Sequence, residues 1–331
     1  MNIHGREFGR NDLLRYANPS ALYGARRVEI ADGRGKGHRL VEVKTAGGLR
    51  LTLSESRCLD IVEAEYKGVN LGFLSKNGIA DSPTIGPETV SFLKYWAGGF
   101  LATCGLRNVG PDCEINGEFF PLHGHIGSTA AEAVSIATDD KAIRITGKMR
   151  ETALYGQCFE MEREITVPID GAKISVRDVV RNLTPEEHHV FLMYHINFGF
   201  PFLSEHLKVD FPPGEVVGKT ELARENIADY TKMTAPVDGA TEHLFLHTPK
   251  DAKPRVTLEN TQLGITAAVS YEKANLPVLA QWKCMRSGDY ALGIEPTTCT
   301  VNGRKEELAK GYDMKIPAFG EMVLGFEVEL M

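Results

Sequence analysis

The sequence predicts an all-β fold, and three observations support this prediction. First, short stretches in which apolar and polar residues alternate recur from one end of the 331-residue chain to the other, as half-buried strands do. Second, glycine-rich turns separate these stretches, without the regularly interposed helices of parallel βαβ units. Third, the 33 glycines stand against only 2 tryptophans, which favours short strands joined by tight turns.

The alternating pattern predicts ten strands along the chain. They are residues 39–44, 49–53, 142–146, 160–167, 173–179, 189–194, 264–270, 276–283, 290–294 and 322–330. Turns that link strands are expected at residues 46–48, 170–171 and 302–303. Helical signals are confined to residues 11–16, 87–95 and 221–230, and we expect short helices on loops there.

Composition and domain signals narrow the class of protein. Apolar residues make up 43% of the chain and charged residues 24%, which excludes disordered, collagen-like and coiled-coil proteins. No linker, charge block or repeat interrupts the alternation, so one large β-sandwich domain over residues 1–331 is expected. The 37 basic and 44 acidic residues give a net charge of −7, which disfavours a nucleic-acid partner.

The sequence also predicts a cytoplasmic protein. The first 14 residues carry several charges and lack the apolar core of a signal peptide, and no stretch has the roughly 18 apolar residues of a membrane span. Six cysteines are scattered without a CxxC pair, so we expect reduced thiols, most of them in the core.

Two histidines beside glycines form the first candidate site. In an extended segment from residue 122 to 126, His123 and His125 would project to the same face, and Gly124 would allow a ligand or another strand to approach closely. The structural alternative is a turn whose two histidines are satisfied by local hydrogen bonds.

The second candidate lies in the Tyr-His-Ile-Asn segment that begins at Tyr194. His195 and Asn197 share one face of the predicted strand. An imidazole titrates near neutral pH and suits general acid work on a sugar ring oxygen. The alternative is that His195 is hydrogen-bonded in the core.

The third candidate combines Glu295 with the segment Gln281-Trp282-Lys283. Glu295 closes an apolar strand, and Pro296 favours an extended backbone before it. Desolvation raises the pKa of such a carboxylate toward the range that a general base needs. Trp282 offers a flat face on which a sugar could stack, or it belongs to the core. Lys283 beside it is a candidate binding residue.

Arg57 interrupts an apolar segment and is the fourth candidate. Its guanidinium offers several donors for hydroxyl or carboxylate groups, while the alternative is an ion pair with Asp60 or a neighbouring acid. The chain contains no serine nucleophile elbow, HExxH motif or P-loop. The glycine-rich run at residues 33–37 lacks the Lys-Ser/Thr ending of a phosphate loop and is expected to be a hairpin turn.

Five segments together resemble the galactose mutarotase (aldose 1-epimerase) superfamily, and more narrowly its bacterial branch of aldose 1-epimerase-like proteins. They are Arg-x-Leu-Asp-Ile at 57–61, Gly-Gly-Phe-Leu-Ala-Thr-Cys-Gly-Leu at 98–106, Leu-His-Gly at 122–124, Tyr-His-Ile-Asn-Phe-Gly at 194–199 and Gly-Ile-Glu-Pro at 293–296. The likeness runs from about residue 30 to the C-terminus, which leaves residues 1–30 as an N-terminal extension.

This resemblance implies a β-supersandwich of large antiparallel sheets with a sugar bound in a cleft. It implies an enzyme without cofactor or metal, with His195 as general acid and Glu295 as general base. It also implies that His123 and Arg57 bind the sugar. The family carries a sugar-binding aspartate between the histidine and glutamate motifs, but residues 242–247 offer no clear counterpart, so the sugar stays undefined.

We therefore expect an isomerase that interconverts the anomers of a small-molecule sugar or sugar derivative. A non-catalytic carbohydrate-binding protein on the same fold is one alternative, and it would not need an acid and a base at one site. A metal-dependent enzyme of the cupin type is another, because His123, His125 and Glu132 faintly resemble its ligand set. Neither a nucleic acid nor a membrane is expected as a partner, and the sequence leaves the oligomeric state open.

Overall fold

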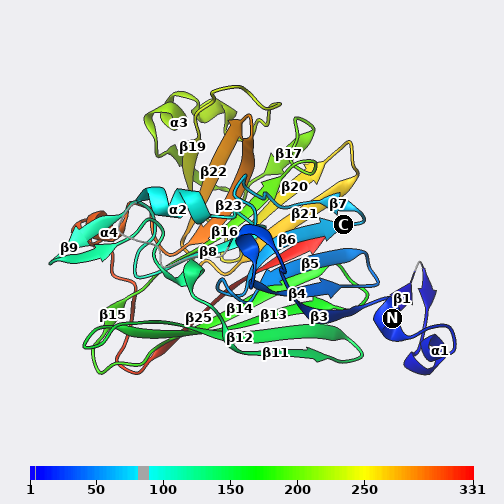
Figure 1. Ribbon diagram of the computed structural model, residues 1–331. Helices are drawn as coiled ribbons and strands as arrows, with labels where there is room; N and C mark the ends of the chain where they lie inside the picture. The colour runs from blue at the N-terminus through cyan, green and yellow to red at the C-terminus, as the bar shows by residue number, and fades with distance from the viewer. Residues whose placement is uncertain (4, 81–88) are drawn as a thin grey trace.

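The computed structural model describes residues 1–3, 5–80 and 89–331, and three antiparallel sheets dominate it (Figure 1). The first sheet has five strands in chain order: β3 (Gly24–Glu29), β4 (Arg39–Lys44), β5 (Leu49–Ser54), β6 (Asp60–Tyr66) and β7 (Val69–Asn70). The predicted hairpin turn at residues 33–37 does connect two paired strands, β3 and β4.

The second sheet has eight strands, all antiparallel to their neighbours. Their order is β11 (Glu132–Thr138), β12 (Ala142–Thr152), β13 (Cys158–Pro168), β14 (Lys173–Asn182), β25 (Glu321–Leu330), β21 (Ile265–Tyr271), β20 (Arg255–Asn260) and β17 (Leu207–Asp210). The C-terminal strand β25 lies in the middle, between β14 and β21, so this sheet joins segments far apart in the sequence (Figure 1).

The third sheet has six strands and carries the candidate site. Their order is β18 (Gly214–Gly218), β19 (His243–Pro249), β22 (Val278–Arg286), β23 (Asp289–Thr297), β16 (Phe191–Gly199) and β8 (Leu101–Leu106). Three two-stranded pairs complete the strands: β1 (Asn2–Ile3) with β2 (Arg6–Glu7), β9 (Cys113–Ile115) with β10 (Glu118–Phe120), and β15 (His188–His189) with β24 (Lys315–Ile316).

The all-β prediction is confirmed, and each of the ten predicted strands has a counterpart. The described residues contain only short helices: α1 (Arg10–Leu14), α2 (Thr89–Tyr95), α3 (Glu221–Glu225) and α4 (Arg304–Ala309). The first three match the expected helical signals, although the start of the 87–95 signal lies outside the described residues. The turn at residues 302–303 was predicted to link two strands, which is wrong, because it leads into α4.

Both faces of the six-stranded sheet are covered. Alternate residues of β16, such as Tyr194 and Ile196, belong to the main apolar core that the three large sheets share. Met193, on the opposite face, belongs to a second, smaller cluster with Cys104 and Ala280. This second face also carries His195, so the candidate site and the smaller cluster occupy the same side of the sheet.

A buried arginine lies where the three sheets meet. Arg163 is fully buried on β13, and its guanidinium donates to Asp178 on β14 at 2.7 and 2.9 Å and to Asp60 on β6 at 2.8 Å. It also donates to Thr103 on β8 at 2.9 Å, and the Tyr194 hydroxyl donates to Asp178 at 2.8 Å. Complete pairing makes this buried charge tolerable.

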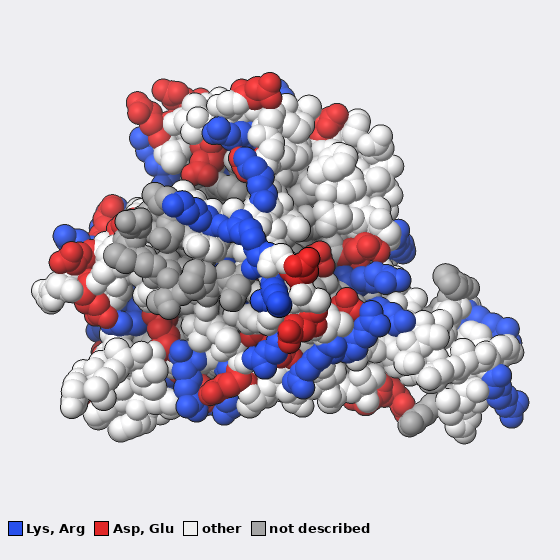
Figure 2. All heavy atoms as spheres, in the orientation of Figure 1, with Lys and Arg blue, Asp and Glu red and all other residues white. Residues whose placement is uncertain are grey.

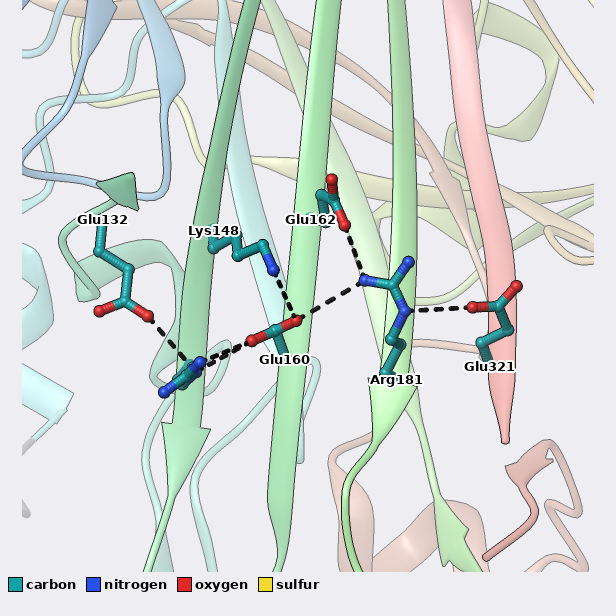
Figure 3. Close-up of polar contacts among 7 residues, drawn as sticks. Glu132, Lys148, Glu160, Glu162, Arg181 and Glu321 are labelled. Carbon is teal, nitrogen blue, oxygen red and sulfur yellow. Dashed lines mark hydrogen bonds and ion pairs between the residues drawn. The ribbon is translucent and has the colours of Figure 1, made fainter. Parts of the chain in front are cut away.

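Charged side chains cover the outer face of the eight-stranded sheet. Basic and acidic groups are interspersed on the molecular face in Figure 2. Across β12, β13 and β14, Glu160 accepts from Lys148 at 3.3 Å and from Arg150 at 2.9 Å, and it lies 3.6 Å from Arg181 (Figure 3). Charged side chains of this kind discourage association of the sheet with another protein chain.

The six cysteines are free thiols, four of them buried, as expected. The N-terminal segment with β1, β2 and α1 projects from the body of the molecule (Figure 1). Among the helices that the structure describes, none has both the length and the apolar character needed to cross a membrane.

Candidate active site

The strand register brings His195 and Glu295 together. Ile196 of β16 lies opposite Ile294 of β23, and Asn197 lies opposite Gly293, so His195 and Glu295 are cross-strand neighbours on one face. Their side chains are buried, and Nε2 of His195 lies 3.2 Å from Oε1 of Glu295. The two predicted catalytic residues are thus in direct contact.

Gly293 makes room for the carboxylate. A Cβ atom built on Gly293 would lie 2.2 Å from Oε1 of Glu295 and 3.0 Å from the Cβ of Trp282, which is the cross-strand neighbour of Gly293 on β22. Any larger side chain would therefore displace the Glu295 carboxylate. Steric exclusion by the Glu295 carboxylate thus explains why the Gly-Ile-Glu-Pro segment has glycine at this position.

Two tryptophan rings pack on the imidazole of His195. The ring centroids of Trp96 and Trp282 each lie 5.4 Å from that of His195, and the two indoles lie 5.9 Å apart. Phe73 contacts both indoles at 6.2 Å. The predicted position of Trp282 beside the site is thus observed, and an apolar wall surrounds the acid–base pair on this side.

His123 joins the same group, although by a different backbone than expected. Its ring centroid lies 6.1 Å from that of His195. The prediction of an extended segment at residues 122–126 is wrong, because His123 and Gly124 have φ angles of 59° and 74° and form a turn. Close approach at Gly124 is observed: a Cβ there would lie 2.2 Å from the carbonyl oxygen of Gly105.

Burial shifts the pKa values of the group toward the uncharged forms. Desolvation, with a smaller contribution from the negative charge of Glu242, raises the pKa of Glu295 to about 8. Desolvation likewise lowers the pKa of His195 to about 3 and that of His123 to about 4. Burial therefore favours the uncharged form of both neighbours, a protonated Glu295 carboxyl group beside a neutral His195 imidazole.

Three buried polar atoms in this group make no well-formed hydrogen bond with the described residues, although Asn197 lies near enough to His195 to oppose the lowering of its pKa by burial. They are Nδ1 of His195, Oδ1 of Asn197 and Oε1 of Glu295. The Asn197 amide nitrogen donates to the carbonyls of Gly99 and His195, both at 3.0 Å, which fixes the orientation of its oxygen. Unsatisfied buried groups are rare in proteins, and their gathering on one sheet face indicates a place for a polar ligand.

A small cavity lies beside Trp96 and His123, two residues that contact His195, but neither His195 nor Glu295 lines it. The cavity has a volume of about 40 Å³, and Arg57, Trp96, Ala102 and His123 are among its lining residues. Arg57 is buried and donates to the carbonyl of Tyr95 at 2.7 Å. Asp60, named in the ion-pair alternative, pairs with Arg163.

Two predicted binding residues lie elsewhere. Lys283 follows Trp282 along β22, so its side chain leaves from the opposite face and donates to the carbonyl of Asp229 at 2.7 Å. His125 is half-buried, and the charged groups that act on it are Arg107 and Glu118. Neither belongs to the cluster around His195.

Trp96 and Glu242 are site residues that the sequence did not indicate. Trp96 directly follows α2, and only the tertiary fold brings it to His195. Glu242 accepts a hydrogen bond of 2.6 Å from the indole nitrogen of Trp282. Glu242 precedes β19, in the segment at residues 242–247 where the family's sugar-binding aspartate has no clear counterpart. Its hydrogen bond to Trp282 depends on the tertiary structure.

The described residues contain no group of three or more His, Cys, Asp or Glu side chains arranged to hold a metal ion. His123 contacts the ring of His195, whereas the charged groups that act on His125 are Arg107 and Glu118.

The chain is similar in structure to several solved proteins. A Klebsiella pneumoniae protein provisionally named aldose 1-epimerase has a TM-score of 0.86 at 20% identity, over 97% of this chain and 86% of that one. A galactose mutarotase-like protein from Clostridium acetobutylicum has a TM-score of 0.68 at 14% identity, over 94% and 99% of the two chains. Galactose 1-epimerase from Lactobacillus acidophilus has a TM-score of 0.63 at 10% identity, over 93% and 99%.

These structural similarities establish the shared mutarotase-like fold, which confirms the resemblance given by the five sequence segments. A search of curated proteins found no match. A protein-family model described as a domain of unknown function, DUF4432, matches residues 35–330. The chain therefore belongs to the DUF4432 family, within the mutarotase-like fold.

Proposed function

We propose that this protein is an aldose 1-epimerase that interconverts the anomers of a small sugar, with His195 as general acid and Glu295 as general base. The observation that carries the proposal is their direct contact on one sheet face, 3.2 Å apart, with unsatisfied buried polar atoms on both side chains. A module that only binds sugar has no need for a coupled acid and base there.

The coupled pair can supply both proton transfers of the reaction. Passing the proton of the Glu295 carboxyl group to Nε2 of His195, 3.2 Å away, produces a carboxylate and an imidazolium. The carboxylate then removes the proton of the sugar C1 hydroxyl while the imidazolium protonates the ring oxygen, which breaks the bond between C1 and the ring oxygen. The open-chain aldehyde rotates about its C1–C2 bond. Ring closure reverses both transfers, which regenerates the carboxylate and the imidazolium, and the proton then returns from His195 to Glu295.

The other residues of the group would bind the sugar. The Trp282 ring offers an apolar face, and Arg57, His123 and Asn197 offer polar groups. A cavity of about 40 Å³ holds about one water molecule, whose share of liquid volume is about 30 Å³. Sugar binding therefore requires that lining side chains such as Trp96 rearrange.

The proposal is tested by following anomer exchange by NMR over a panel of neutral aldoses and acidic sugars. On any sugar that the wild type turns over, Glu295→Gln and His195→Asn should each lower the exchange rate by at least about 10²-fold. The double variant should lose little more than the worse single variant, because the two groups act in one step.

His247→Asn is a matched control, since His247 is a buried strand histidine whose Nε2 contacts Gln281 at 3.0 Å on the same sheet. It should keep near-normal exchange. Undiminished exchange in Glu295→Gln would refute the assignment, and sugar binding without exchange in the wild type would favour the binding-protein alternative.

A further inference from the structure

Lys219 lies on the face of the six-stranded sheet that carries the candidate site. It directly follows β18, and its backbone N–H donates to the carbonyl of Leu244 at 2.8 Å, which extends the pairing of β18 with β19. Leu244 lies opposite Trp282, and Trp282 lies opposite Gly293. The Lys219 side chain therefore leaves from the same face as Trp282 and Glu295.

The ammonium group of Lys219 holds the turn that follows β23. It donates to the carbonyl of Thr300 at 2.9 Å and to that of Val301. The buried Glu307 of α4 holds the same turn through other groups: it accepts from the Thr300 hydroxyl at 2.7 Å and from the Asn302 N–H at 3.0 Å. A cation on the carbonyls and an anion on the donors together fix this turn, five to seven residues after Glu295.

The turn at residues 300–303 also contacts the loop around Gly110, to which His123 is hydrogen-bonded. The Gly303 N–H donates to the carbonyl of Val109 at 3.0 Å, and a Cβ on Gly110 would lie 2.5 Å from the Val301 carbonyl oxygen. Gly110 accepts from the backbone N–H of His123 at 3.0 Å, and its own N–H lies 3.3 Å from Nδ1 of the His123 ring. A continuous set of contacts thus runs from Lys219 to His123.

We propose that Lys219 is a positioning residue of the site: its ammonium group fixes the turn at residues 300–303, and through it the His123 loop, while bringing a positive charge to the face that carries Glu295. The inference rests on the proposed function for its catalytic meaning, but its structural part does not depend on that function.

The electrostatics agree with this geometry. The charge of Lys219 lowers the pKa of Glu295, against the larger effect of burial and the opposing charge of Glu242, and it adds to the burial that lowers the pKa of His123. Around Lys219 itself lie Glu306 and Glu307 of α4, Lys310 directly after this helix, and Cys299, and burial lowers its pKa to about 8. The residue is therefore cationic at and below neutral pH.

The first experiment measures the pKa of His123 by NMR and needs no activity. Lys219→Met removes the charge and the donors, so the His123 pKa should rise by roughly half a pH unit or more. Lys219→Arg keeps a cation and should restore most of the wild-type value. Lys283→Met is the control, because Lys283 also donates to a backbone carbonyl but lies on the opposite face; it should leave the His123 pKa unchanged. An unchanged value in Lys219→Met would overturn the proposal.

The second experiment records anomer exchange against pH. Losing the cation makes the Glu295 carboxylate harder to form, so the active pH range of Lys219→Met should move upward, with Lys219→Arg close to wild type. A uniform loss of rate at all pH values would instead indicate a merely structural role and would overturn the catalytic part. If the wild type exchanges no anomers, the proposed function fails, while the His123 titration still decides the role of Lys219.

Discussion

Glu295 is held where its charge is disfavoured, and this has a cost for folding. In the unfolded chain the carboxyl group ionises near its ordinary pKa of 4.5, whereas burial raises the pKa to about 8 in the folded protein. Below pH 4.5 both states hold the proton, and no cost arises. Between pH 4.5 and 8 the unfolded state releases the proton more readily, so the folded state loses stability as the pH rises.

Replacing the acid should therefore stabilise the protein in a pH-dependent way. Glu295→Gln should raise the free energy of unfolding at pH 8 by an amount on the order of 4 kcal/mol, and the gain should vanish near pH 4.5. Urea unfolding at several pH values measures this difference. The pKa of His195 is lowered from 6.5 to about 3, so its titration affects the stability below about pH 6.5, and it does so in the wild type and in the variant. A gain that does not change with pH would contradict the prediction.

At the scale of the strand, the site depends on rows of cross-strand neighbours. Trp282, Gly293 and Asn197 form one row across β22, β23 and β16, and His195 with Glu295 forms the next. The carboxylate of Glu295 lies over the bare backbone of Gly293, its neighbour two residues away on the same face. Gly293 is therefore needed to leave space for the Glu295 side chain and not to bend the backbone.

Gly293→Ala should displace the Glu295 carboxylate and leave the sheet in place. We expect anomer exchange to fall about 10²-fold, because the base loses its position, with a modest loss of stability of about 1 to 3 kcal/mol from overcrowding. Gly147→Ala on β12 is the control: its added Cβ would meet only side-chain atoms at 3.3 to 3.4 Å, away from the site. Equal exchange in the two variants would show that the carboxylate position is not limiting.

The strands also show what the sequence could and could not predict. His195 and Glu295 were predictable because each places a titratable group in an otherwise apolar strand. Trp282 and Lys283 were both predicted to bind the sugar, yet adjacent residues of a strand point to opposite faces, and only Trp282 faces the site.

Other features depend on contacts that no local pattern contains. Helix α4 spans only six residues of mixed charge, too few to show an amphipathic repeat. Trp96 and Lys219 reach the site through tertiary packing and cross-strand register, so neither could be predicted from neighbouring residues.

At the scale of the whole molecule, Arg163 ties the three large sheets to one another. Its partners lie on β14 of its own eight-stranded sheet, on β6 of the five-stranded sheet and on β8 of the six-stranded sheet. The main apolar core likewise draws residues from all three sheets. We propose on these grounds that the chain unfolds as one domain.

Arg163→Met should destabilise the whole molecule at once. Removing the cation leaves Asp60 and Asp178 buried without their partner, which costs about 3 to 5 kcal/mol. Circular dichroism and calorimetry should show a single transition at lower temperature, and Arg163→Lys should recover part of the loss. Arg150→Met, on the solvent side of neighbouring β12, should cost about 1 kcal/mol or less. Two separate transitions would contradict the single-domain proposal.

The two tryptophans of the chain both pack against His195, and this gives the protein a built-in optical probe. All of its indole emission comes from one place, and that place is where the sugar is proposed to bind. A ligand that rearranges Trp96 or covers Trp282 would change the emission whether or not any bond is broken. Sugar binding can therefore be measured by tryptophan fluorescence on the unlabelled protein, separately from anomer exchange. A panel of sugars can be screened for binding in this way before any reaction is known.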